Sequence, residues 1–230
     1  MEDNYESKAW NNFLSIRESD PNCRDASFEH CRSFFIKDRS EPKKRDEIAL
    51  HLFAYLASWG MLRNPFMMQK DYLFHRKVVD ILCEDKYNKL LIWEPLYSKE
   101  NDSMIALIDN LKERIVETYK KETYYKDSEK EPKPHIIKNV TDTLASKIIL
   151  GTFGCVPAYD ENLVRGLKGI APRKFDADSL KAVIDYAQEN KTYIEKCKET
   201  LKRSIPDACD LYTTMKIVDI LLFGKGVHIK

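Results

Sequence analysis

Three polar side chains recur at helical spacing in the longest apolar stretch of the chain, between Ile48 and Leu62. His51, Tyr55 and Ser58 stand at i, i+4 and i+7, so they share one face of a helix. An imidazole, a phenol and a hydroxyl on an apolar wall offer the few orienting hydrogen bonds that a ligand pocket uses. The alternative is a structural stripe whose polar atoms are satisfied by neighbouring segments.

A second polar group lies in the segment 65–83, which carries a broad apolar face. Lys70 and Asp71 project within this face, and His75 follows Asp71 by one helical turn. A carboxylate bonded to an imidazole four residues later fixes the tautomer and raises the imidazole pKa, which suits a general base or a phosphate-binding group. The structural alternative is a surface pair that contributes about 0.2–0.5 kcal/mol.

A third candidate is the carboxylate of Asp160, which follows a run without charged residues from Ile148 to Tyr159. We expect a helix to end at Gly151 in a left-handed conformation, an apolar loop to follow, and a new helix to begin at Asp160. A carboxylate at a helix N-terminus is stabilised by free backbone N–H groups. Asp160 is therefore either the catalytic acidic residue or a plain N-cap.

Composition limits the classes of function. The chain has 230 residues with 38 basic and 37 acidic side chains, which argues against a surface built as a whole for nucleic acid. The first residues are polar and acidic, unlike a secretory signal, and the longest apolar stretch is too short to cross a bilayer. We therefore expect a cytoplasmic protein with no membrane association, whose six cysteines are free thiols.

Seven glycines and a high content of Lys, Glu and Leu favour helices throughout. The expected N-caps are Thr141 or Asp142, Asp160, and Asp176 or Asp178. Asn64 is expected to cap a helix that starts at Pro65. The expected helices cover residues 5–17, 27–37, 45–62, 64–83, 101–119, 142–151, 160–167 and 206–224. Residues 176–201 are expected to form either one long helix or two helices broken near Asn190.

The predicted fold is an all-α multi-helix bundle with a long central buried helix at 45–62. Residues 121–135 are rich in charge and contain two prolines near their end, which is typical of an exposed loop or hinge. We predict a single all-helical domain over 1–230, with the alternative of two halves, 1–120 and 136–230, joined by this hinge.

The segment 147–165 resembles the end of the catalytic core in the helix-hairpin-helix DNA glycosylase superfamily. Lys147 lies on a helix, and an apolar loop leads through Pro157 to Asp160 and Val164-Arg165, in the same order as in that superfamily. The glycine-rich hairpin expected before the lysine is absent, and Pro157 is one residue further from the aspartate. The resemblance covers about twenty residues and implies an acidic residue facing a base pocket. The chain as a whole looks like a bacterial helical globular protein.

No complete catalytic motif, cofactor motif or metal-ligand spacing is found, so we expect no cofactor and no metal. The leading hypothesis is a helical domain that binds a small ligand or a protein partner between the central helix and the loop 151–160. The alternative is a nucleic-acid-binding protein or a glycosylase-like enzyme with Asp160 as its acidic residue. That alternative requires Arg63, Lys70, Arg76 and Lys77 to join Lys168, Arg173 and Lys174 in one basic face.

Overall fold

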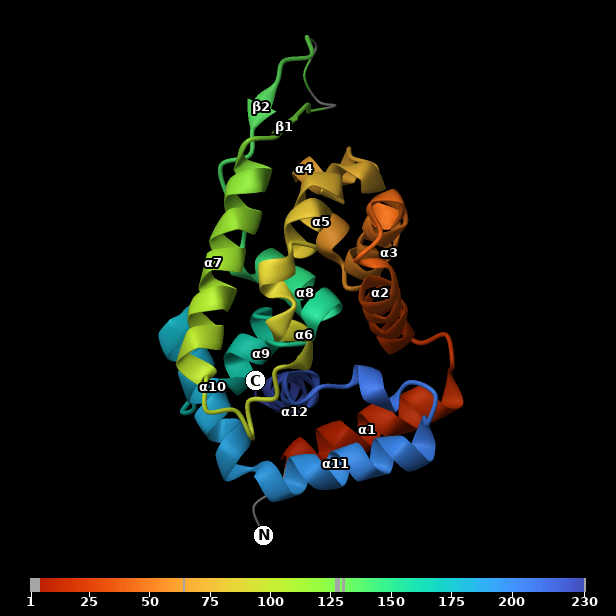
Figure 1. Ribbon diagram of the computed structural model, residues 1–230, viewed down its shortest axis with the longest axis vertical. Helices are drawn as coiled ribbons and strands as arrows, with labels where there is room; N and C mark the ends of the chain where they lie inside the picture. The colour runs from red at the N-terminus through yellow and green to blue at the C-terminus, as the bar shows by residue number, and fades with distance from the viewer. Residues whose placement is uncertain (1–4, 64, 127–128, 130, 230) are drawn as a thin grey trace.

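The computed structural model describes residues 5–63, 65–126, 129 and 131–229, which form an all-α bundle (Figure 1). The α-helices are α1 (Tyr5–Ser19), α2 (Arg24–Asp38), α3 (Arg45–Ser58), α4 (Pro65–Met68), α5 (Arg76–Leu82), α6 (Lys89–Ile92), α7 (Asn101–Lys120), α8 (Asp142–Phe153), α9 (Glu161–Gly166), α10 (Ala177–Glu189), α11 (Lys191–Ser204) and α12 (Thr214–His228). Short 3-10 helices are η1 (Pro42–Lys44), η2 (Met61–Arg63), η3 (Tyr72–His75), η4 (Asp85–Tyr87) and η5 (Cys209–Leu211).

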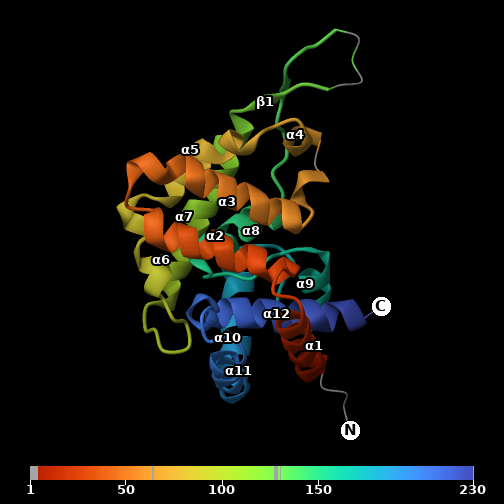
Figure 2. The same ribbon diagram turned by 90° about the vertical axis from the view of Figure 1, so that its right-hand side faces the viewer.

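Helices from both sides of residues 121–135 pack against each other. α1 contacts α12, α2 contacts α8, and α7 contacts α10, so one apolar core joins the early and the late part of the chain. In Figures 1 and 2, α1, α11 and α12 lie together at one end of the bundle, and α3, α4 and α5 lie toward the other. The most enclosed helix is α8, in which every residue from Leu144 to Phe153 is buried. α3 buries one face and leaves Leu50 46% exposed.

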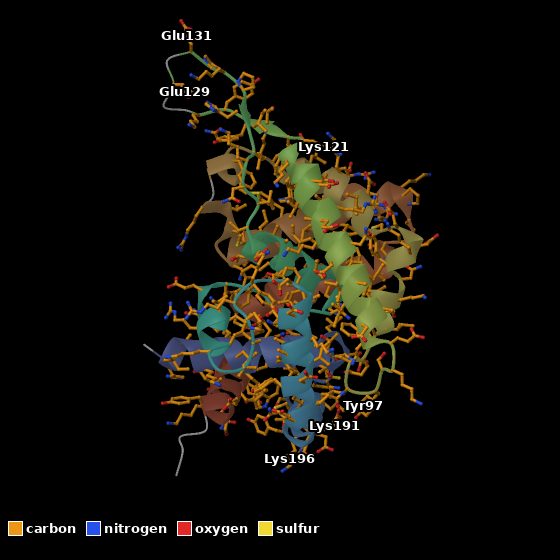
Figure 3. The ribbon with its side chains drawn as sticks, turned by 90° about the vertical axis from the view of Figure 1, so that its left-hand side faces the viewer. Tyr97, Lys121, Glu129, Glu131, Lys191 and Lys196 are labelled. Atoms are coloured by element: carbon orange, nitrogen blue, oxygen red, sulfur yellow. The ribbon has the colours of Figure 1, made fainter. Side chains whose placement is uncertain are left out.

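The charged segment 121–135 forms a hairpin at the end of α7. Its strands β1 (Thr123–Tyr124) and β2 (His135–Ile136) are antiparallel, with Thr123 opposite Ile136. Figure 3 shows Glu129 and Glu131 at the tip of this hairpin, away from the helices. Residues 127, 128 and 130 of the predicted hinge lie outside the described part of the chain.

The predicted N-caps are confirmed at three helices. The side chains of Thr141, Asp160 and Asp176 accept hydrogen bonds from the backbone N–H groups of Leu144, Leu163 and Ser179 at 3.1–3.2 Å. Each bond satisfies one of the amides that have no partner in the first helical turn. Of the two alternatives for residues 176–201, the structure shows two helices, because α10 ends at Glu189 and α11 begins at Lys191.

The predicted continuous helix over 64–83 is wrong. α4 ends at Met68, and the Asp71 carboxylate then accepts a hydrogen bond from Leu73 N and starts η3 as a new N-cap. A capping side chain of this kind competes with the helical hydrogen bonds and favours a restart of the helix. The expected cap at Asn64 lies outside the described residues. The helix predicted to reach residue 62 ends at Ser58, because Gly60 has a φ of 72°.

Two glycines that were predicted to end helices lie inside them instead. Gly151 belongs to α8, where a Cβ would stand 2.5 Å from Tyr55 Cε1, and the left-handed C-cap is Gly154 with a φ of 66°. Gly224 belongs to α12, where a Cβ would overlap Ala9 of α1. Both glycines are therefore set by close packing and not by chain reversal. The last helix also begins later than predicted, because Thr213 caps it through Lys216 N.

The crossing of α9 and α12 brings two main chains into direct contact. A Cβ on Gly166 would overlap the carbonyl oxygen of Leu222, and a Cβ on Gly226 would overlap that of Asn162. Only glycine allows this approach. The crossing holds the short helix α9, and therefore its cap Asp160, against α12.

Candidate functional site

Three cationic side chains from three helices converge on the indole of Trp59, the residue that directly follows α3. The Arg24 guanidinium lies 4.1 Å from a ring centroid of the indole, Lys147 Nζ lies 4.7 Å away, and Lys216 Nζ lies 5.1 Å away. Cations within about 6 Å of an aromatic face are attracted to its negative side. Trp59 is therefore the common contact of the first residue of α2, the middle of α8 and the first turn of α12.

Carboxylates pair with the two lysines. Lys216 Nζ lies 3.1 Å from Asp219 Oδ2 and 3.6 Å from Asp25 Oδ1, and Lys147 Nζ lies 3.1 Å from Asp160 Oδ2. The side chains of Lys216 and Lys147 are only 1% and 3% exposed. Charges taken this far out of water are costly unless each one is paired.

The sequence positions these pairs through local geometry. Lys216 and Asp219 are one turn apart on α12, and the second oxygen of Asp219 accepts a hydrogen bond from Ala158 N at 2.8 Å. Ser146 of α8 accepts one from Tyr159 N at 2.8 Å. The loop between α8 and α9 is thus held from two sides, and Asp160 at its end both caps α9 and pairs with Lys147.

Burial and charge act in opposite directions on the ionisation of this cluster. Burial disfavours the Lys216 ammonium, but the carboxylates of Asp219 and Asp25 outweigh it and raise the pKa of Lys216. Burial raises the pKa of Asp219, against the pull of Lys216. Burial, and then the nearby carboxylates led by Asp219, raise the pKa of the Tyr55 phenol well above its ordinary value. Tyr55 therefore stays neutral, and Lys216 stays charged, at neutral pH.

A pocket of about 130 Å³ opens beside the cluster, between α1, the start of α2, and α12. Its polar side is formed by Arg24, Asp25, Lys216 and Asp219, with Trp59 at the edge. Its other walls are mainly apolar and include Phe13, Ile220 and Phe223. A small apolar chamber with a few convergent polar groups is the usual form of a ligand site.

A wider hollow of about 680 Å³ is lined by Arg24 and Trp59 as well. Arg63 and Ser58 also line it. The cation–π pair of Arg24 and Trp59 is therefore common to both spaces.

Among the six other residues predicted to bind a ligand, those of α3 point to different surroundings. Tyr55 is buried in the core against Phe28. Ser58 lines the wider hollow and donates its hydroxyl proton to Ala54 O. The ring of His51 stacks on Phe34 with the centroids 3.5 Å apart.

The predicted group Lys70, Asp71 and His75 does not form one cluster. The helix is interrupted, so Asp71 caps η3 while the imidazole Nδ1 of His75 lies 2.5 Å from Tyr119 Oη. His75 is 1% exposed, and burial lowers its pKa to about 4. Lys70 Nζ lies 5.5 Å from the centre of the Phe74 ring.

Sequence reasoning identified Asp160 but missed Lys216, Asp219, Asp25 and Trp59. One signal was present, because Lys216 and Asp219 are the two charges in the first two turns of an otherwise apolar helix. Charged residues at i and i+3 on a buried face must pair with each other or with a partner. Asp25 and Trp59 carried no local signal, because only tertiary packing brings them to α12.

No helix in the described part of the chain combines the length and the apolar character that a membrane crossing requires. Within the same residues, no three His, Cys, Asp or Glu side chains are arranged to hold a metal ion. Comparison of the chain with protein-family models, with curated proteins and with solved structures gives no significant match.

Proposed function

We propose that this chain binds a small molecule with one planar ring in the pocket beside Trp59. The observation that carries the proposal is the convergence of buried, paired charges and an indole on one small chamber. Ionisable groups with shifted pKa values that line a cavity are enriched at functional sites. A purely structural core avoids such groups, because apolar side chains of the same volume are usually at least as stabilising.

The size of the pocket supports a single ring. Its volume is about 130 Å³. An engineered apolar cavity of about 150 Å³ in another protein takes up benzene. Phe13 and Phe223 supply apolar walls, and Trp59 supplies an aromatic surface at the edge.

The charge balance of the pocket supports a neutral or zwitterionic ligand. Arg24 and Lys216 contribute two positive charges, and Asp25 and Asp219 contribute two negative charges. An ionic ligand would bring one more charge into this balanced set, next to the buried pair of Lys216 and Asp219. A ring with a donor and an acceptor on one edge, such as an amide or a pyrimidine base, would find partners of both kinds.

The test is a comparison of five probes of similar size by thermal unfolding and calorimetry: uracil, benzamide, nicotinamide, benzoate and benzylamine. We expect the three neutral probes to raise the Tm and the two ionic probes to have little effect. Asp25→Asn removes one negative charge from the pocket and should shift the preference toward benzoate. Asp102→Asn, an exposed change on α7, is the control. If no neutral probe binds, or if benzoate and benzylamine bind as tightly as the neutral probes, the proposal fails.

A second function, an enzyme acting on nucleic acid, is favoured by one specific observation. Lys147 and Asp160 pair at 3.1 Å across the loop, and both belong to the segment that resembles the glycosylase core. Against it, Lys147 is 3% exposed, and two of the required basic residues are already paired: Arg76 with Asp46 and Asp80, and Lys77 with Glu122.

Binding to DNA and RNA at low salt, where phosphate contacts are strongest, tests this second function. A binding signal that is lost at high salt, together with base release that Asp160→Asn abolishes, would favour the enzyme over the ring-binding domain. Absence of binding at low salt would remove it.

A further inference from the structure

A buried arginine that does not line the pocket at Trp59 lacks an acidic partner among the described residues. Arg32 of α2 is 2% exposed, and its Nη1 donates to Thr152 O at 2.9 Å. Its Nε is buried and has no hydrogen-bond partner, and no carboxylate among the described residues lies within ion-pair distance of its guanidinium. A buried cation without a counter-charge is strongly unfavourable, because its lost hydration is not replaced by an ion pair.

The fold compensates this charge only in part. Thr152 is in the last turn of α8, whose free carbonyl groups carry a partial negative charge of about one half. Burial lowers the pKa of Arg32 to about 10, and the neighbouring groups that oppose this effect are the thiols of Cys155 and Cys31. The guanidinium therefore stays positive at neutral pH beside two groups that are themselves neutral there.

Arg32 lines a cavity of about 250 Å³ together with Thr213. Its guanidinium lies next to Thr213, because a Cβ at Gly154 would stand 2.8 Å from Arg32 Nη1 and 3.0 Å from Thr213 Cγ2. Lys198 and Lys202 of α11 line the same cavity. Residues from α2, α11 and the segment before α12 thus surround one space.

The two lysines differ in their pairing. Lys198 Nζ lies 3.1 Å from Glu94 and 3.3 Å from Glu195, so its charge is balanced. Lys202 is exposed and has no acidic partner within the described chain. Asp210 also lines the cavity, which leaves one positive charge in excess among the lining residues.

We propose that this cavity binds an oxyanion, the phosphate or carboxylate group of a small molecule, between Arg32 at its base and Lys202 at its edge. Arginine and lysine are the side chains that bind such groups through charge-assisted hydrogen bonds. Leu91, Ile92 and Trp93 line the same cavity, and Ile92 is 86% exposed, so an apolar body attached to the anion has a surface to cover. The site is separate from the pocket at Trp59 and does not rest on the function proposed above.

The experiment measures phosphate binding to the full chain. Sodium phosphate should raise the Tm by about 5 °C or more, beyond sodium chloride of equal ionic strength, when phosphate exceeds its Kd about 100-fold. Lys202→Gln removes one charged contact from an exposed position and should raise the phosphate Kd about tenfold or more. Lys196→Gln is the matched control, because Lys196 is an exposed lysine of the same helix that does not line the cavity (Figure 3).

A second readout places the anion. Trp93 lines the cavity, so phosphate should change the tryptophan fluorescence of the chain, and Trp93→Phe should remove this change. Phenyl phosphate binding more tightly than inorganic phosphate would assign the site to esters with an apolar body, and equal binding would assign it to the free anion. The proposal is overturned if phosphate acts like chloride, if Lys202→Gln and Lys196→Gln bind phosphate equally, or if Trp93→Phe keeps the fluorescence change.

Discussion

Gly151→Ala should destabilise the protein, although alanine is the better helix former. In an ordinary helix interior this change adds about 1 kcal/mol to the free energy of unfolding. At Gly151 the new Cβ would stand 2.5 Å from Tyr55 Cε1 and 2.7 Å from Cδ1. Carbon atoms in favourable contact are about 3.5–4.0 Å apart, so the overlap is about 1 Å.

The Tyr55 ring cannot move aside easily. It is 1% exposed and is flanked by the rings of Phe28 and Trp59 at 6.4 and 6.5 Å between centroids. Overpacking of a closed core costs about 1–3 kcal/mol, and here it exceeds the gain in helix propensity. An overlap of about 1 Å against a ring that cannot move puts the cost at about 2–3 kcal/mol, so we expect a net loss of about 1–2 kcal/mol for Gly151→Ala.

A double-mutant cycle with Tyr55→Leu, measured by urea unfolding, isolates this contact. Leucine has no Cε1, and its Cδ methyl groups can rotate away from Gly151, which the rigid ring cannot do. Gly151→Ala should therefore become stabilising by about 0.5–1 kcal/mol in that background, a coupling of about 2 kcal/mol. In the background of Phe175→Leu, a buried ring that does not approach Gly151, the effects should add within about 0.5 kcal/mol. If Gly151→Ala stabilises the wild-type protein by about 1 kcal/mol, the packing explanation is refuted.

Three further predictions concern charge and thiols. Because the pKa of His75 is depressed in the folded protein, the unfolded chain binds a proton at this residue between about pH 6.5 and pH 4 and the folded chain does not. The unfolding free energy should therefore fall by up to about 3 kcal/mol as the pH drops through this range. Urea unfolding of His75→Gln should lack this part of the pH dependence, and an unchanged slope would contradict it. Asp160→Asn keeps the cap but leaves buried Lys147 without its carboxylate, so it should lower the unfolding free energy by about 1–3 kcal/mol. Asp176→Asn, at a cap with no ion pair in the described chain, should lower it by less than about 0.5 kcal/mol. Equal losses in the two variants would mean that the Lys147 pair is unimportant. A thiol reagent should label Cys209 in the native protein and the other five cysteines only after unfolding, and fast labelling of a second thiol would contradict their burial.

The sequence predicted the helical class and several helix ends well, because these depend on local chemistry. The caps Thr141, Asp160 and Asp176 were visible as short polar side chains before apolar periodic runs. Such signals act over a few residues, so they are largely independent of the rest of the fold.

The errors have a common physical origin in long-range packing. Gly151 and Gly224 looked like helix ends, but each is a place where another segment, Tyr55 or Ala9, comes too close for a side chain. The stretch 64–83 looked continuous because its apolar spacing is helical, whereas the capping side chain of Asp71 interrupts the backbone. Local patterns do not distinguish these cases.

The candidate site shows the same limit. Asp160 was identified from its own surroundings in the sequence. Its relation to Lys216 and to Trp59 depends on the packing of α12 against α9 and on the end of α3, segments that are far apart along the chain. The pair Lys216 and Asp219 could have been noticed as charges inside an apolar helix, but its partner Asp25 could not.

The glycine contact between α9 and α12 has a consequence for how this protein can change through mutation. Side chains in a core can be exchanged for others of similar volume, and the neighbouring side chains then adjust. At Gly166 and Gly226 the partners are carbonyl groups of the main chain, which have no rotamers with which to adjust. The spacing between the cap of α9 and the charged first turns of α12 is therefore independent of the apolar residues around it. The walls of the pocket can vary to suit a different ring, while Asp160 keeps its position at the end of the loop and Asp219 keeps its hydrogen bond to Ala158 N.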